Sequence, residues 1–128
     1  MKKLNLLRAL LYAGSLFYLV GAVVHFFGLT LFPFYVATLY SPYHDSVIAM
    51  ASLLFGILFL VTARDPVKNK DTLFVMIIGV ALAAVFSFAI IWKVDFAVLG
   101  APARQTQSLI EGGVALAYFA VLWILYPR

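Results

Sequence analysis

Cysteine is absent from this 128-residue sequence, and charged residues are scarce. Without a thiol the chain forms no disulfide, no thiolate metal site, no iron–sulfur cluster and no catalytic cysteine. Charged side chains make up 11% of the residues, whereas about 25% is usual in soluble domains. Hydrophobic residues make up 66%, which is more apolar surface than a small soluble fold can bury. The composition therefore excludes a soluble enzyme, a disordered tail and a secreted disulfide scaffold.

Sequence motifs of catalysis are also missing. The chain has no phosphate-binding glycine loop, no Gly-x-Ser-x-Gly and no His-Glu-x-x-His. The serines inside apolar stretches have no base within sequence reach, and such serines usually bond to their own helix backbone. These absences favour a non-enzymatic protein.

Long apolar runs are what the sequence has instead. Four stretches, at about 9–32, 47–63, 72–92 and 109–126, are each close to the ~20 residues that cross a bilayer. Proline falls in all three connectors between them, where its missing N–H costs little. We predict an all-α membrane protein in which residues 1–128 form a single integral membrane domain, an antiparallel four-transmembrane-helix bundle.

The basic residues predict the orientation of this bundle. Lys and Arg near span ends stay on the cytoplasmic side of a membrane. Seven of the nine basic residues fall on the side of the termini and the second connector: Lys2, Lys3, Arg8, Arg64, Lys68, Lys70 and Arg128. We therefore expect both termini in the cytoplasm and the protein in the cell's inner (plasma) membrane. The net charge of +4 follows from this rule and indicates no nucleic-acid partner.

Small residues recur at helical spacing in every span. In lipid such residues mark faces where helix backbones approach closely. The first span has glycines at positions 14, 21 and 28, with Tyr18 and His25 on the same face. The fourth opens with Gly112 and Gly113, and Gly113 lies four residues before Ala117. These faces predict close helix packing within the bundle, and also a homo-oligomer or a larger membrane complex.

Four ionisable side chains are candidates for chemistry on the extracytoplasmic half: His25, His44, Asp45 and Glu111. His25 and Glu111 lie at membrane depth, where ionisable groups are costly and often functional. Imidazole and carboxylate together suit Zn, Cu, Fe or Mn, and imidazole also suits a proton relay. The structural alternatives are that His25 bonds a neighbour inside the bundle, His44 and Asp45 cap a helix, and Glu111 pairs with Arg104 or Lys93.

One short motif carries a resemblance. The run Ala63-Arg64-Asp65-Pro66, after an apolar helix with Gly56 and before Asn69, resembles small four-span bacterial membrane protein families of unknown function. The similarity covers roughly residues 41–90. Such families often have a histidine in the third helix, and this chain has none there. The resemblance supports the architecture and implies no activity.

Three functions remain open at this point. We expect a non-enzymatic accessory or structural subunit of a membrane assembly, without a cofactor. The first alternative is a metal- or haem-binding redox component that uses His25 with His44, Asp45 or Glu111. The second is an oligomeric channel or exporter for a small solute, which the nearly charge-free inner halves of the spans disfavour.

Overall fold

The computed structural model describes residues 1–31 and 35–127. Its long helices are α1 (Lys2–Phe27), α2 (Pro42–Arg64), α3 (Lys70–Lys93) and α4 (Ala103–Leu125), and a short 3-10 turn, η1 (Ala37–Leu39), precedes α2. Each of the four is long and apolar enough to cross a membrane. The prediction of an all-helical chain with four apolar helices is confirmed.

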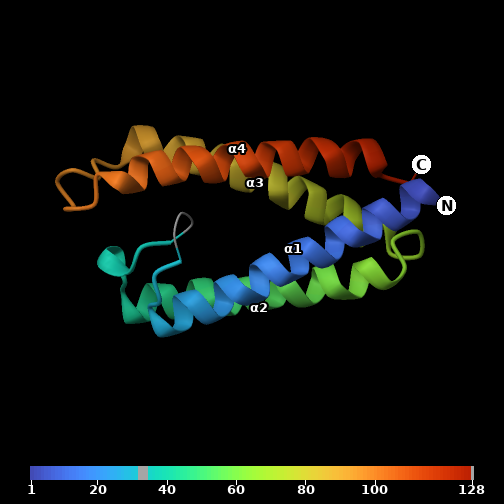
Figure 1. The fold of residues 1–128 in the computed structure, drawn as a ribbon, viewed down its shortest axis with the longest axis horizontal. Helices are drawn as coiled ribbons and strands as arrows, with labels where there is room; N and C mark the ends of the chain where they lie inside the picture. Colours follow the sequence, from blue (N-terminus) through green and yellow to red (C-terminus); the bar gives the residue numbers. More distant parts are fainter. Residues whose placement is uncertain (32–34, 128) are drawn as a thin grey trace.

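The helices form two antiparallel hairpins, α1 with α2 and α3 with α4 (Figure 1). The start of α1, the end of α4 and the turn between α2 and α3 lie together at what we call the terminal end. The opposite end, where α1 and α3 finish and α2 and α4 begin, is the loop end. The ribbons of the two hairpins diverge toward the loop end (Figure 1).

The apolar core occupies the terminal half. Each of the four helices contributes at least two buried side chains to this core. The core therefore joins the two hairpins there. Its buried members are Leu7, Leu11, Phe59, Ala63, Leu73, Met76, Ile77, Val80, Leu122 and Leu125. Two tyrosine hydroxyls add hydrogen bonds between helices: Tyr118 to the carbonyl oxygen of Leu10 at 2.7 Å, and Tyr126 to that of Lys70 at 3.4 Å.

The first helix differs from the predicted 9–32 span at both ends. It begins at Lys2 and ends at Phe27, because Gly28 takes a left-handed conformation with φ of 63°. The N–H of Leu29 then bonds to the carbonyl of Val24 at 2.9 Å, which closes the helix end. The predicted last residue, Phe32, lies outside the described residues.

The remaining helices match the predicted spans and extend beyond most of their ends. The second begins at Pro42 instead of 47, because proline suits the first turn, where its missing N–H would have no helical partner. The fourth begins at Ala103 instead of 109. Both added segments contain polar residues, so hydropathy alone placed the starts too late.

Glycine marks close packing at some of the predicted faces and not at others. A Cβ on Gly56 would lie 2.8 Å from the Leu19 side chain, and one on Gly14 would lie 2.9 Å from Phe59. A Cβ on Gly21 or Gly113 would meet nothing within 4 Å. At the start of the fourth helix the predicted close packing is met by Gly112, where a Cβ would lie 2.9 Å from Phe88 of α3, and not by Gly113.

Candidate functional site

The start of α2 holds a carboxylate that gathers three hydrogen bonds. Ser41 is the N-cap, and its backbone N–H donates to Oδ2 of Asp45 at 2.7 Å. The other oxygen, Oδ1, lies 2.6 Å from Nδ1 of His25 and accepts the hydroxyl of Tyr35 at 2.9 Å. Asp45 is only 4% exposed, and a buried carboxylate needs such partners. The contacts join the end of α1, the segment before η1 and the start of α2.

Tyr35 completes this cluster from the segment between α1 and α2. Its backbone pairs with that of Leu31 through two hydrogen bonds of 2.8 Å, which fixes the ring beside α1. The ring centroid lies 4.4 Å from that of His25. Burial raises the pKa of Tyr35 to about 12, and the hydrogen bond to the Asp45 carboxylate and its negative charge add to the effect. The phenol therefore stays protonated and donates to Asp45 at neutral pH.

His44 is exposed and turned away from this cluster. Its Nδ1 lies 2.9 Å from the hydroxyl of Ser41, and its ring meets that of Tyr43 edge-on. Sequence neighbours on a helix point in different directions, which is why His44 and Asp45 separate. The prediction that His44 and Asp45 cap the helix is wrong in its placement, because both lie inside α2, and the N-cap Ser41 makes no side-chain capping bond. Asp45 instead accepts the backbone N–H of Ser41 from within the helix.

A second polar group lies on α4. Arg104 donates to both carboxylate oxygens of Glu111, at 2.8 Å and 3.3 Å, and to Oε1 of Gln107 at 3.3 Å. The predicted pairing of Glu111 with Arg104 is confirmed. Gln107 is 3% exposed, and its Nε2 finds no hydrogen-bond partner in the structure.

The four candidate ligands are therefore divided. The fold joins His25 to Asp45, places Glu111 with Arg104, and leaves His44 on the surface. Within residues 1–31 and 35–127, no three His, Cys, Asp or Glu side chains are grouped as a metal ion would require. A site that contains His25 has Asp45 as its neighbour, and Tyr35 is the third member that the sequence did not indicate.

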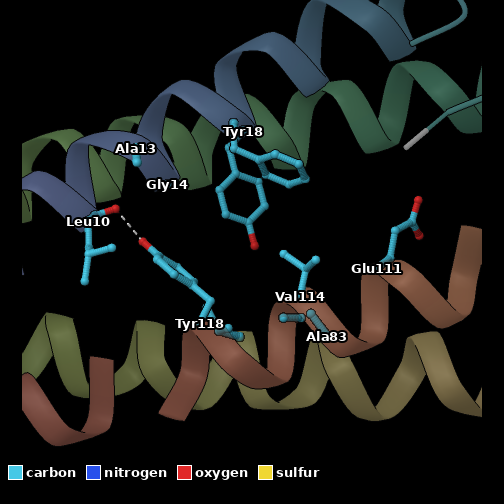
Figure 2. Close-up of a pocket in the computed structure, with 11 residues that line it drawn as sticks. Leu10, Ala13, Gly14, Tyr18, Ala83, Glu111, Val114 and Tyr118 are labelled. Atoms are coloured by element: carbon cyan, nitrogen blue, oxygen red, sulfur yellow. Dashed lines mark hydrogen bonds between the residues drawn. The ribbon is translucent and has the colours of Figure 1, made fainter. Parts of the chain in front are cut away.

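An apolar cleft separates the hairpins in the middle of the molecule, between α1 and α4 (Figure 2). The hollow in the middle of the molecule has a volume of about 310 Å³, and its walls include Leu10, Phe17 and Val114. The Tyr118 hydroxyl, bonded to Leu10, lies at its terminal side, and Glu111 lies toward its other side (Figure 2).

The cleft continues to the loop end. A second hollow of about 440 Å³ shares Ala13, Phe17, Tyr18 and Glu111 with the first, so the two are adjacent. Its walls also include His25, Tyr35 and Arg104. The cleft therefore links an apolar middle to both polar groups.

Sequence reasoning missed the cleft and the role of Tyr35. The only sequence signal for the cleft is Gly21, a small residue on the same face as His25. Glycine on a helix face suits both close packing and open space, and here it borders open space.

Comparison of the chain with protein-family models, curated proteins and solved structures finds no match. The resemblance carried by Ala63-Arg64-Asp65-Pro66 stays a prediction, and the function is argued from the molecule itself.

Proposed function

We propose that this protein is a non-enzymatic accessory subunit of a membrane assembly, multi-pass in the inner (plasma) membrane. The observation that carries the proposal is a row of small residues on the outward face of α4. Gly113, Ala117 and Ala120 are spaced by four and three residues and are all exposed. A Cβ on Gly113 would meet nothing within 4 Å.

The other faces of α4 are used within the chain, unlike this row of small residues. Gly112 on α4 is buried against Phe88 of α3, and the cleft side of α4 bears Val114 and Tyr118. The fold therefore uses the other sides of α4 and leaves the small residues free. In lipid, helix association is driven by close van der Waals packing, which small residues permit. A helix of a second copy or of a larger partner fits such a face.

The proposed orientation places the terminal end in the cytoplasm. The described basic residues of the termini side, from Lys2 and Lys3 to Lys68 and Lys70, flank the helices at that end. Lys93 and Arg104 flank the loop end. The excess of Lys and Arg at the terminal end favours the cytoplasmic side and attraction to anionic lipid there.

Native mass spectrometry of the protein, extracted gently from its own membrane, tests the subunit proposal. We expect a multiple of 14.2 kDa or a complex with a heavier partner. Gly113→Leu should dissociate it, because the leucine keeps a partner backbone at a distance. Gly21→Leu is the matched control, since it also enters open space but on the cleft side. A monomer of 14.2 kDa in both the native protein and the variants contradicts the proposal.

His25 favours a second candidate, a metal- or haem-binding redox component. Its Nδ1 contacts a buried carboxylate, the arrangement that commonly orients a histidine ligand through its other nitrogen. In this candidate Asp45 orients His25 and is not itself a ligand. Metal analysis and the visible spectrum of the natively extracted protein test it. A stoichiometric metal or a haem band that His25→Ala removes supports the candidate. If the native protein shows no metal and no haem band, the candidate is rejected.

A further inference from the structure

The cleft between the hairpins has one apolar part and one polar part, arranged along the length of the molecule. The apolar part begins beside Tyr118, near the middle of the helices, with Leu10, Val80 and Val114 in its walls. The polar part lies at the loop end, where His25 and Glu111 face the same space. In a bilayer the loop end lies toward one surface and the apolar part toward the membrane centre. This is the arrangement of a single amphiphile in one leaflet.

The volumes also fit a chain-like ligand. The two adjacent parts measure about 310 and 440 Å³, within the range of ~300–1,000 Å³ for small-molecule sites. Such sites are mostly apolar with a few convergent polar groups, as here. Gly21 keeps the space open, because a side chain there would project into it.

The charges at the polar end select the head group. Arg104 is neutralised by its two contacts with Glu111, and Asp45 already accepts three hydrogen bonds. The two acidic groups at the polar end each face a basic side chain, Glu111 facing Arg104 and Asp45 facing His25. A phosphate or carboxylate head would therefore meet no unpaired cation. An uncharged head is favoured.

The histidine supplies the hydrogen-bonding specificity. Its Nδ1 lies 2.6 Å from the Asp45 carboxylate, which assigns the ring proton to that nitrogen. The other nitrogen, Nε2, is left for a ligand, and a hydroxyl suits it because a hydroxyl can both donate and accept a hydrogen bond.

We propose that the cleft binds one uncharged long-chain amphiphile with a hydroxyl-bearing head, tail beside Leu10 and Val114 and head at His25. This site lies on the other side of α4 from the small-residue face, so it is independent of the subunit role. The two features are separated by Gly21→Leu and Gly113→Leu, one of which fills the cleft while the other alters the outward face.

Native mass spectrometry of the detergent-purified full chain with 1-monoolein, oleate or phosphatidylglycerol tests the proposal. We expect one retained monoolein, with a Kd about tenfold lower than for either anionic probe. Gly21→Leu should raise the monoolein Kd about tenfold or more, while Gly113→Leu leaves it unchanged. His25→Phe should reduce the preference for monoolein over oleate, because it keeps an aromatic ring and removes the hydrogen-bonding nitrogen.

Two results overturn the proposal. If all three probes are retained equally and Gly21→Leu changes nothing, the lipids associate with the protein surface non-specifically and the cleft is not a binding site. Preference for oleate or phosphatidylglycerol shows that the head-group argument from charge is wrong. Loss of assembly in Gly113→Leu bears on the subunit role alone.

Discussion

The two ends of this molecule are held together in different ways. At the terminal end, buried apolar side chains from all four helices form one core, with Phe59 fully buried in it. At the loop end the polar groups connect residues within one hairpin, His25 with Asp45 and Arg104 with Glu111. The comparison teaches that the apolar core joins the helices of the two hairpins at the terminal end. At the loop end the two connectors instead line a common hollow, with Val36 and Leu39 in its walls beside Ala101 and Arg104. The loop end is therefore the part available to a ligand.

Removing the largest buried side chain of the terminal core should have the largest effect. Phe59 contacts the rings of Tyr18 and Tyr118 and lies against Gly14. Phe59→Ala should lower the free energy of unfolding by about 4 kcal/mol, through lost burial and the cavity left behind. Unfolding by a denaturing detergent in mild micelles measures the change.

The matched control is Phe86→Ala, because Phe86 is 66% exposed on α3. We expect a change below about 0.5 kcal/mol there. Equal effects of the two substitutions would show that the terminal core does not dominate stability.

Disrupting the cluster of His25, Tyr35 and Asp45 at the loop end should lower the stability less than Phe59→Ala does, and the effect should be confined to that end. Asp45→Asn removes the charge that His25, Tyr35 and the N–H of Ser41 share, and about 2 kcal/mol is typical for hydrogen bonds to a charged group. We expect faster hydrogen exchange at the Ser41 amide, with the terminal half of α3 unchanged. Asp95→Asn is the control, since this exposed carboxylate accepts from the nearby backbone N–H groups of Ala97 and Val98. Uniform acceleration along all helices would contradict a local role.

A methyl group at the closest helix contact tests packing within one hairpin. A Cβ on Gly56 would lie 2.8 Å from the Leu19 side chain and 3.3 Å from its backbone nitrogen. Overpacking outweighs the gain in helix propensity, so Gly56→Ala should destabilise by about 1 kcal/mol. Gly21→Ala, with nothing within 4 Å, should be neutral or slightly stabilising. Thermal unfolding of both variants separates the two cases, and greater loss in Gly21→Ala would contradict the packing described.

The last prediction concerns the Tyr35 phenol, and its effect is confined to alkaline pH. Its pKa is raised by burial from an ordinary 10.0 to about 12, so folding favours the protonated form. The corresponding stability is complete below pH 10 and is lost as pH rises through about 12. An ultraviolet titration of tyrosinate, compared with Tyr35→Phe, should isolate one phenol with a midpoint near pH 12. A midpoint near 10 would mean that Tyr35 is solvent-exposed and free of Asp45.

Hydropathy predicted the four helices well, because ~20-residue apolar runs dominate the sequence. It could not predict where α1 ends, since that depends on the left-handed conformation of Gly28. The contact of His25 with Asp45 depends on how α1 meets α2, which residues twenty positions apart do not reveal. Arg104 and Glu111, seven residues apart on one helix, were within reach of sequence reasoning.

The separation of the hairpins was beyond the sequence for a different reason. A stripe of small residues predicts closeness, yet Gly14 and Gly56 lie in tight contacts while Gly21 borders open space. Whether a side chain packs against a given glycine depends on how the helices cross and on large neighbouring residues such as Tyr118. The sequence therefore indicated a bundle, and only the structure distinguishes a closed bundle from an open one.

The most direct test of the account is a pair of inter-hairpin distances in lipid nanodiscs by electron spin resonance. The cysteine-free chain allows labels at Leu29→Cys and Val98→Cys for the loop end, and at Leu6→Cys and Ile124→Cys for the terminal end. All four positions are exposed. We predict a longer and broader distribution at the loop end than at the terminal end. Equally short, narrow distributions at both ends would show a closed bundle and contradict the cleft.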